Sequence, residues 1–205
     1  MSELPLVTVI TPTWQRHEYL LTRCIPGVQA QGYPATEHLV ISDGPDAELA
    51  AKLSMPWLDG WKNLWYRELP AHDPEPHHGH HARAYGLELA RGEYITYCDD
   101  DDALRPAHCS RLAQALDEHP EAGFAVSQMC SHGPHGTSTI GAGPLACGNV
   151  GTPMIMHRRE IAQVASWDHA SAFEDWELVL AWLNAGIEHV RVDEETSDVW
   201  PSLYR

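Results

Sequence analysis

The amino-acid sequence predicts an α/β fold: a mostly parallel sheet with helices on both faces. Short apolar runs of strand length alternate with apolar stripes at helical spacing, which is the pattern of repeated βα units. The hydrophobic content of 43% and the eight tryptophans exclude a disordered chain. A length of 205 residues suffices for one well-buried core, so we expect a single domain over residues 1–205.

The expected strands are short and mostly apolar. The first stops at Thr11-Pro12-Thr13, because proline has no N–H to donate and sits at the end or edge of a strand. The second ends in the turn signal Ser42-Asp43-Gly44-Pro45. In chain order, strands are expected at residues 6–10, 38–41, 64–69, 94–98, 124–128, 154–157 and 189–192.

The expected helices lie between these strands. Pro106 suits the first turn of one helix, and Gly186 is placed to end the last. Helices are expected over residues 20–28, with a bend near Pro26, then over 46–53, 82–90 and 106–119, from residue 159 and from residue 173. Residues 131–148 are Gly-rich and polar, which predicts a mobile segment and a candidate lid.

Four consecutive aspartates, Asp99, Asp100, Asp101 and Asp102, follow the strand expected at 94–98. Adjacent carboxylates repel one another, and a folded site holds them together when a cation compensates. Oxygen ligands suit Mg²⁺ or Mn²⁺, which also bind substrate phosphates. Ligands bind beyond the carboxyl ends of parallel strands, so Asp43 should meet this block at one edge of the sheet. A solvated acidic turn is the alternative; the position after a buried strand favours the metal site.

Charge and composition exclude several classes of protein. Thirteen basic and 29 acidic residues give a net charge of −16, which disfavours nucleic acid and anionic lipid as partners. We find no run of 18 apolar residues and no signal-peptide pattern in MSELPLVTVI, so we expect no membrane span. The five cysteines form no C-x-x-C pair, which favours reduced thiols and a cytoplasmic location.

Four blocks of the sequence occur in an order and spacing typical of one enzyme family. They read VTVITPTWQR, HLVISDG, ARAYGLELARGEYITYCDDDD and FEDWELVLAWLNAG, and they extend from residue 6 to about 190. Together they resemble the family 2 glycosyltransferases. The resemblance implies a GT-A fold with a nucleotide-binding half over about 1–102 and an acceptor-binding half over about 103–205. It also implies an inverting transfer of a sugar from a nucleotide diphosphate, mostly UDP or dTDP, to an acceptor hydroxyl.

The resemblance implies a set of nucleotide-binding residues. The backbone of Pro12, Thr13 and Trp14 is expected to lie against the nucleoside. Asp43 is expected to bind the edge of the pyrimidine, and Arg83 to lie near the nucleotide.

The same resemblance assigns roles within the aspartate block. The family pattern Asp-x-Asp-Asp, with a proline four residues later, falls on Asp99, Asp101 and Asp102 when counted back from Pro106. Asp101 is expected to be the main ligand of Mn²⁺ or Mg²⁺, with Asp99 as a second ligand. Asp99 or Asp100 is expected to contact the ribose.

Glu174 and Asp175 match the family's catalytic-base motif. An inverting transfer needs a carboxylate that takes the proton of the acceptor hydroxyl, and we assign this role to Asp175, with Glu174 as its neighbour or substitute. Taken alone, the pair could simply be acidic residues at a helix N-terminus, where the helix dipole favours them. The other three blocks favour the catalytic reading.

The sequence departs from the family at two points, and two other functions compete with this interpretation. Ala84 stands where the family usually has asparagine, and the Gln/Arg-x-x-Arg-Trp motif of processive polymerases is absent, which favours single additions. A nucleotidyltransferase would need a Gly-rich loop after the first strand, where TPTWQRHEYL stands. A non-catalytic binding subunit would need no base. The His-rich segment 72–81 could hold Zn²⁺ or Ni²⁺, but a polar loop beside the site is the simpler interpretation.

Overall fold

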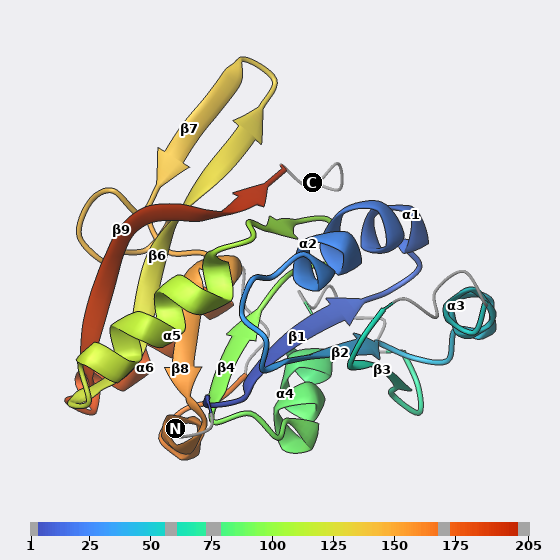
Figure 1. Ribbon diagram of the computed structural model, residues 1–205, viewed down its shortest axis with the longest axis horizontal. Coiled ribbons are helices and arrows are strands. Elements are labelled where there is room, and N and C mark those ends of the chain that lie inside the picture. Colours follow the sequence, from blue (N-terminus) through green and yellow to red (C-terminus); the bar gives the residue numbers. More distant parts are fainter. Residues whose placement is uncertain (1–3, 56–60, 73–78, 168–172, 201–205) are drawn as a thin grey trace.

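A computed structural model describes residues 4–55, 61–72, 79–167 and 173–200. Its centre is a nine-stranded sheet in the order β3-β2-β1-β4-β8-β6-β9-β5, with β7 paired to β6 (Figure 1). The strands are β1 Val7–Thr13, β2 Thr36–Ser42, β3 Leu64–Glu68, β4 Tyr94–Tyr97, β5 Ala103–Leu104, β6 Ala122–Gly133, β7 Gly136–Ile140, β8 Ile155–Arg158 and β9 Glu188–Val199. The helices are α1 His17–Tyr19, η1 Leu20–Cys24, α2 Ile25–Gln29, α3 Ala47–Leu53, α4 His80–Leu89, α5 His108–Glu118, η3 Thr152–Met154, η4 Arg159–Gln163 and α6 Glu174–Asn184.

The α/β class predicted from the sequence is confirmed, and the longest pairings in the sheet are parallel. Strands β3, β2, β1 and β4 run parallel to one another, as βα units require. Beyond β4 the sheet is mixed, because β8 pairs antiparallel with both β4 and β6, whereas β6 and β9 run parallel. The one sheet therefore continues through both halves of the chain.

Helices cover both faces of the sheet. Alternate residues of a strand point to opposite faces, so Val40 belongs to one apolar cluster whereas Leu39 and Ile41 belong to the other. The first cluster receives side chains from η1, α2, α3 and α5. The second receives them from α4, α6, η3 and η4. This two-sided burial is the arrangement that the sequence predicted.

Helix α4 approaches the sheet closely at Gly86. A Cβ atom there would lie 2.6 Å from Cγ2 of Ile10 and 3.3 Å from Cγ1 of Ile41, closer than side-chain atoms pack. The glycine therefore lets α4 lie directly on β1 and β2.

Pro12 sits inside β1 rather than beyond its end. Strand β4 pairs with β1 only from Val7 to Ile10, whereas β2 follows β1 to Thr13. At Pro12 one side of β1 has therefore lost its neighbour, and the strand tolerates a residue without an N–H. The sequence placed proline at a strand end or edge, and the local edge is what the structure shows.

Three segments differ from the sequence expectations. The first part of the Gly-rich segment 131–148 is a β-hairpin, in which β6 and β7 project beyond the rest of the sheet (Figure 1). The helix expected from residue 159 is only the short 3₁₀ segment η4. Strand β9 is longer than the expected 189–192 and also pairs with the short strand β5, which the sequence did not predict. Pairing across the chain, rather than local pattern, determines these strands.

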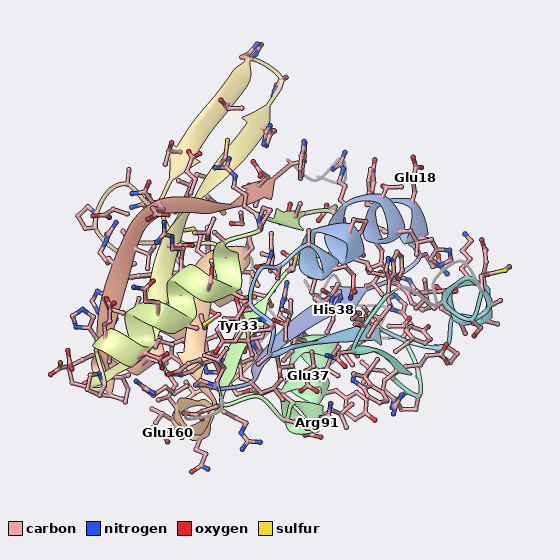
Figure 2. The ribbon with its side chains drawn as sticks, in the orientation of Figure 1. Glu18, Tyr33, Glu37, His38, Arg91 and Glu160 are labelled. Carbon is pink, nitrogen blue, oxygen red and sulfur yellow. The ribbon has the colours of Figure 1, made fainter. Side chains whose placement is uncertain are left out.

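The amino-terminal ends of the strands are held by a buried charge. Glu37 accepts a hydrogen bond from Thr8 Oγ1 at 2.6 Å and from Arg91 Nε at 2.8 Å. Figure 2 shows Glu37 and Arg91 side by side at this end of the sheet. Among the described residues, no helix has the length and apolar character needed to cross a membrane.

Candidate active site

The residues singled out from the sequence gather where β1, β2 and β4 end. These three strands run parallel, so their carboxyl ends open at the same edge of the sheet. The backbone N–H of Asp43, just after β2, donates to the carbonyl of Thr13 at 2.9 Å. The aspartate block follows β4 at the same edge. The prediction that Asp43 and the block meet there is confirmed.

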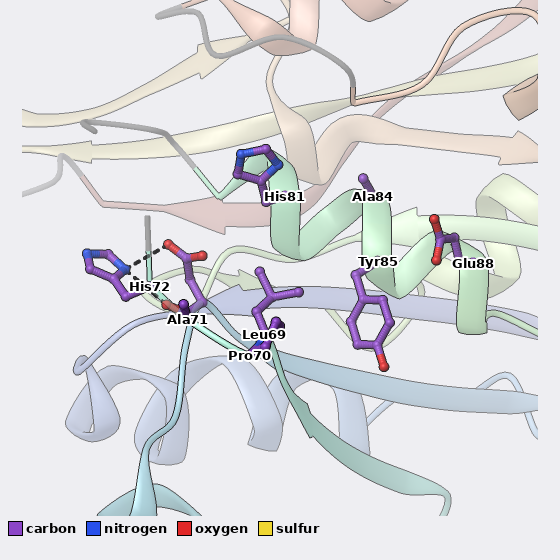
Figure 3. Close-up of a pocket in the computed structure, with 9 residues that line it drawn as sticks. Leu69, Pro70, Ala71, His72, His81, Ala84, Tyr85 and Glu88 are labelled. Atoms are coloured by element: carbon purple, nitrogen blue, oxygen red, sulfur yellow. Dashed lines mark hydrogen bonds and ion pairs between the residues drawn. The ribbon is translucent and has the colours of Figure 1, made fainter. Parts of the chain in front are cut away.

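A cavity of about 520 Å³ opens beside Asp43 (Figure 3). Nδ1 of His72 lies 3.0 Å from Oδ2 of Asp43, and the His72 ring stacks on Trp14 with centroids 4.2 Å apart. Ala84 lines the cavity from α4, so the departure from the family's asparagine lies on this surface. The lining is completed by Leu69, Pro70, Ala71, His81, Tyr85 and Glu88.

Helix α4 begins against the end of β1. Gly79, which precedes it, has a φ of 84°, a left-handed conformation that glycine adopts without steric cost. A Cβ atom on Gly79 would lie 2.8 Å from Cβ of Pro12. The backbone N–H of Arg83 donates to the carbonyl of Gly79 at 2.9 Å. The close approach of Gly79 to Pro12 therefore fixes the position on α4 from which the Arg83 side chain extends.

Arg83 joins the aspartate block to the start of α6. Its Nη2 lies 2.6 Å from Oδ1 of Asp99, and its Nη1 lies 2.5 Å from Oε1 of Glu174. The guanidinium also lies over the ring of Trp167, 4.9 Å from the centroid. Arg83 is buried, so one fixed cation serves carboxylates from two distant parts of the chain.

Asp100 is buried, with one hydrogen bond and one ion pair to its carboxylate. Thr13 Oγ1 donates to its Oδ2 at 2.8 Å, and Arg16 Nη2 lies 2.5 Å from its Oδ1. Burial raises the pKa of Asp100 to about 6, although Arg16 and Thr13 oppose the shift. Since its side chain is only 1% exposed, Asp100 is placed to hold Arg16 rather than to meet a ligand.

Asp99 and Asp101 are the members of the block that stay open to solvent, with side chains 26% and 14% exposed. Arg16 Nη1 donates to Oδ2 of Asp101 at 2.8 Å. Burial raises the pKa of Asp101, and burial together with the charges of Asp99 and Asp101 raises the pKa of Asp102 well above its usual range. Among the described residues, the four carboxyl groups of the block outnumber the two guanidiniums, of Arg16 and Arg83, that pair with them.

Glu174 and Asp175 open helix α6, as the sequence predicted. Burial raises the pKa of Glu174 from 4.5 to about 7, although Arg83 opposes the shift. Burial also raises the pKa of Asp175. Asp175 makes no ion pair with any described residue; its Oδ1 accepts from the backbone N–H of Trp176 at 2.6 Å.

The carboxylates at this edge fit a hard divalent cation. The block, Glu174 and Asp175 together carry six carboxyl groups, and in the part of the chain that the structure describes two guanidiniums, of Arg16 and Arg83, pair with them. The oxygens of the block do not converge within 4.8 Å as a closed cage would. That openness suits Mg²⁺ or Mn²⁺, which take one or two carboxylates and complete their shell with phosphates and water.

A second group of possible ligands has a different explanation. Cys130, His132 and Asp198 bring their ligand atoms within 4.8 Å of one another. Both oxygens of Asp198, however, accept hydrogen bonds from Arg105 at 2.9 Å, and His132 Nε2 lies 2.8 Å from Oδ1. A bidentate guanidinium repels a cation and occupies the carboxylate, so we assign this group as an ion-pair network.

The His-rich segment can be followed only at its ends, because residues 73–78 lie outside the described residues. His72 belongs to the cavity, whereas the rings of His80 and His81, at the start of α4, lie 3.9 Å apart. Among the described residues of this segment, no cluster of metal ligands forms.

Arg16 was missed by the sequence reasoning. It lies within the block VTVITPTWQR, but the resemblance assigned no role to it. Its position just after β1, at the edge where an anionic ligand would bind, was the available signal. Only the fold shows that it reaches Asp100 and Asp101.

Comparison with known sequences gives one family. The sequence model described as "Glycosyl transferase family 2" matches residues 8–139. One curated relative is the GalNAc(5)-diNAcBac-PP-undecaprenol beta-1,3-glucosyltransferase of Campylobacter jejuni, 28% identical over 120 residues. That match covers 56% of this chain and 36% of the relative, so the matched part spans well under half of the relative's length.

Solved structures with the same fold include two glycosyltransferases. Residues 1–349 of TarS from S. aureus, in complex with UDP-GlcNAc, match with a TM-score of 0.75 at 18% identity, covering 98% of this chain and 60% of that one. The mannosyltransferase PcManGT from Pyrobaculum calidifontis, in complex with GDP-Man and Mn²⁺, matches with a TM-score of 0.70 at 14% identity, covering 97% and 57%. At these identities the likeness shows the fold, and the GT-A architecture expected from the sequence is confirmed.

Proposed function

The chain belongs to glycosyl transferase family 2, and on this premise we propose that it is an inverting, divalent-cation-dependent glycosyltransferase that moves a sugar from a nucleotide diphosphate to an acceptor hydroxyl. The observation that carries the proposal is the junction at Arg83, which pairs with both Asp99 and Glu174. This junction supports the proposal because it brings Asp99, proposed for the donor side, close to Glu174, the neighbour of the proposed base.

For the donor we propose a sugar linked to UDP or dTDP. The carboxylate of Asp43 can accept a hydrogen bond from the imide N–H of a pyrimidine, and His72, whose ring stacks on Trp14, lies beside it. Pro12 and Thr13 lie at the end of β1, where their backbone would face the nucleoside. The UDP-GlcNAc complex of TarS supports this choice, and the GDP-Man complex of PcManGT makes GDP the main competing result.

For the cation we propose Mn²⁺ or Mg²⁺ held by Asp101, with Asp99 as a second ligand. Bound there, the cation would neutralise charge on the departing diphosphate. Asp99 is also the better placed of the two candidates for a ribose contact, because Asp100 is buried against Thr13 and Arg16.

For the base we propose Asp175. Glu174 is 8% exposed, and its carboxylate already forms an ion pair with Arg83 through Oε1. Asp175 lies next to it and makes no ion pair among the described residues. Its raised pKa makes it a stronger base once it is deprotonated. Asp175 would take the acceptor proton as the hydroxyl oxygen bonds the anomeric carbon and the bond to the diphosphate breaks.

The test is the thermal transition of the purified protein with UDP, dTDP, GDP or ADP, each with Mn²⁺, Mg²⁺ or EDTA. A ligand at about a hundred times its Kd adds roughly 2.7 kcal/mol to the unfolding free energy. We expect stabilisation by one pyrimidine diphosphate, only with metal, and its loss in Asp101→Ala. The exposed Asp193→Ala is the matched control. If no nucleotide shifts the transition with any metal, the donor site does not exist.

A further inference from the structure

Arg16 bridges two members of the aspartate block that differ in burial. Its Nη2 pairs with Asp100, which is buried and also held by Thr13 Oγ1. Its Nη1 pairs with Asp101, which is partly exposed. The Arg16 side chain is itself 31% exposed. One end of the guanidinium is therefore anchored in the interior, and the other is held at a surface where ligands can compete.

The other two arginines at this edge, Arg83 and Arg23, make different contacts. Arg83 is buried between Asp99 and Glu174. Arg23 donates to the backbone carbonyl of Asp101 at 3.1 Å, and its guanidinium lies over the rings of Tyr19 and Trp200. Of these three arginines, Arg16 is thus the one that is itself partly exposed and that pairs with a partly exposed carboxylate.

The partner of Arg16 is also the carboxylate proposed to bind the divalent cation. A guanidinium and a metal ion compete for the same oxygens, and their like charges repel one another at this distance. The diphosphate of a donor, in contrast, offers new anionic oxygens, and arginine pairs well with phosphate.

We propose that Arg16 is an exchangeable counter-ion of the donor site. Without ligands it neutralises Asp101; when cation and diphosphate bind together, Nη1 leaves Asp101 for a diphosphate oxygen while Nη2 stays on Asp100. The inference rests on the proposed function, because it requires both ligands. It makes Arg16 a residue that couples the binding of metal and nucleotide, and such coupling acts equally in both directions.

The experiment measures Mn²⁺ binding directly, from the electron paramagnetic resonance signal of free Mn²⁺, with and without UDP. It compares the unaltered chain with Arg16→Met and with Arg111→Met as the matched control. Arg111 pairs with Glu194 on the surface, so its replacement changes the net charge equally while leaving the site intact. Thermal transitions in EDTA verify that each variant folds.

In Arg16→Met we expect Mn²⁺ affinity without UDP to rise about tenfold, because the competing cation is gone. We expect the gain in Mn²⁺ affinity that UDP produces to shrink from about tenfold or more to about threefold or less. Arg16→Lys keeps one positive charge but cannot bridge two carboxylates, so its Mn²⁺ affinity and its UDP enhancement should lie between those of the unaltered chain and of Arg16→Met. If Arg16→Met does not fold, Arg16→Lys tests the inference in its place.

Unchanged Mn²⁺ affinity and unchanged UDP enhancement in a folded Arg16 variant would overturn this inference while leaving the proposed function standing. Failure of the unaltered chain and of Arg111→Met to bind either Mn²⁺ or UDP would overturn the proposed function, and this inference with it.

Discussion

The guanidinium of Arg83 and the carboxylate of Glu174, 91 positions apart in the sequence, lie 2.5 Å from each other in the buried interior. This pair joins α4, which lies on β1 and β2, to the first turn of α6. It also places Asp175, the neighbour of Glu174, at the same edge of the sheet as the aspartate block. The pair is therefore both a structural junction and the scaffold of the candidate base.

Replacing Arg83 by methionine should destabilise the fold. Asp99 and Glu174 would lose their shared cation, and an uncompensated buried charge costs about 3–5 kcal/mol. Urea unfolding at neutral pH measures the change. Arg111→Met, which breaks a surface pair, should cost about 1 kcal/mol or less. A loss below about 1 kcal/mol in Arg83→Met would show that the junction contributes little to stability.

Replacing Asp175 by asparagine should remove catalysis but not donor binding. Loss of a general base lowers the turnover rate by about 10²–10⁴-fold, whereas the residues proposed to bind UDP and Mn²⁺ lie elsewhere in the site. Transfer or slow hydrolysis of the donor, together with the UDP-induced thermal shift, measures both properties. Glu177→Gln, an exposed change on the same turn of α6, is the control and should keep full activity. Full activity in Asp175→Asn would exclude this residue as the base.

The contribution of Glu174 to the free energy of unfolding should fall as the pH rises from about 4.5 to about 7 in the absence of metal. The pKa of Glu174 is raised from 4.5 to about 7, so in this window Glu174 binds more proton in the folded chain than in the unfolded chain. Its contribution to stability then decreases with pH and stops changing above about 7. The buried His38, His108 and His157, whose pKa values burial lowers, contribute with the opposite sign, so the contribution of Glu174 is measured as a difference. Urea unfolding in EDTA at several pH values compares the unaltered chain with Glu174→Gln. The free energy of the unaltered chain minus that of the variant should fall across this window, and an equal slope in both proteins would contradict the assignment.

Replacing Asp43 by alanine should weaken UDP binding. The carboxylate lies at the cavity beside Trp14 and His72, and losing one charge-assisted hydrogen bond costs about 1.5–3 kcal/mol, or roughly tenfold or more in Kd. Isothermal titration with UDP and Mn²⁺ measures Kd, with the exposed Asp193→Ala as control. Equal affinity in both variants would place the nucleobase away from this cavity.

Replacing Gly86 by alanine should destabilise the protein although alanine favours helices. The new Cβ would lie 2.6 Å from Cγ2 of Ile10, and overpacking of this kind costs about 1–3 kcal/mol. The gain in helix propensity, about 1 kcal/mol, offsets part of that cost. Thermal unfolding measures the balance. Gly32→Ala, where a Cβ meets only the carbonyl of Pro106 at 3.6 Å, is the control without a clash. Increased stability in Gly86→Ala would show that α4 can shift outward.

Local patterns in the sequence predicted the elements that depend on local pattern. The apolar runs of β1, β2 and β4 and the stripes of α4, α5 and α6 each stand out in their own residues, so their existence and order were predicted. The hairpin of β6 and β7 and the full length of β9 were not. Their residues are polar or exposed along much of their length, and pairing with distant strands is what makes them extended.

The sequence by itself determined the α/β class, the family, and which carboxylates follow which elements, because these depend on residue order and on periodicity. Tertiary structure decided which of those carboxylates are open and which are already paired. Asp100 and Asp101 are neighbours in the chain, yet one is buried under Thr13 and the other faces solvent. Arg16 and Arg83 find their partners through the parallel pairing of β1 with β4 and the packing of α4 on the sheet. Ion pairs act through space over a few ångströms, and only folding sets those distances.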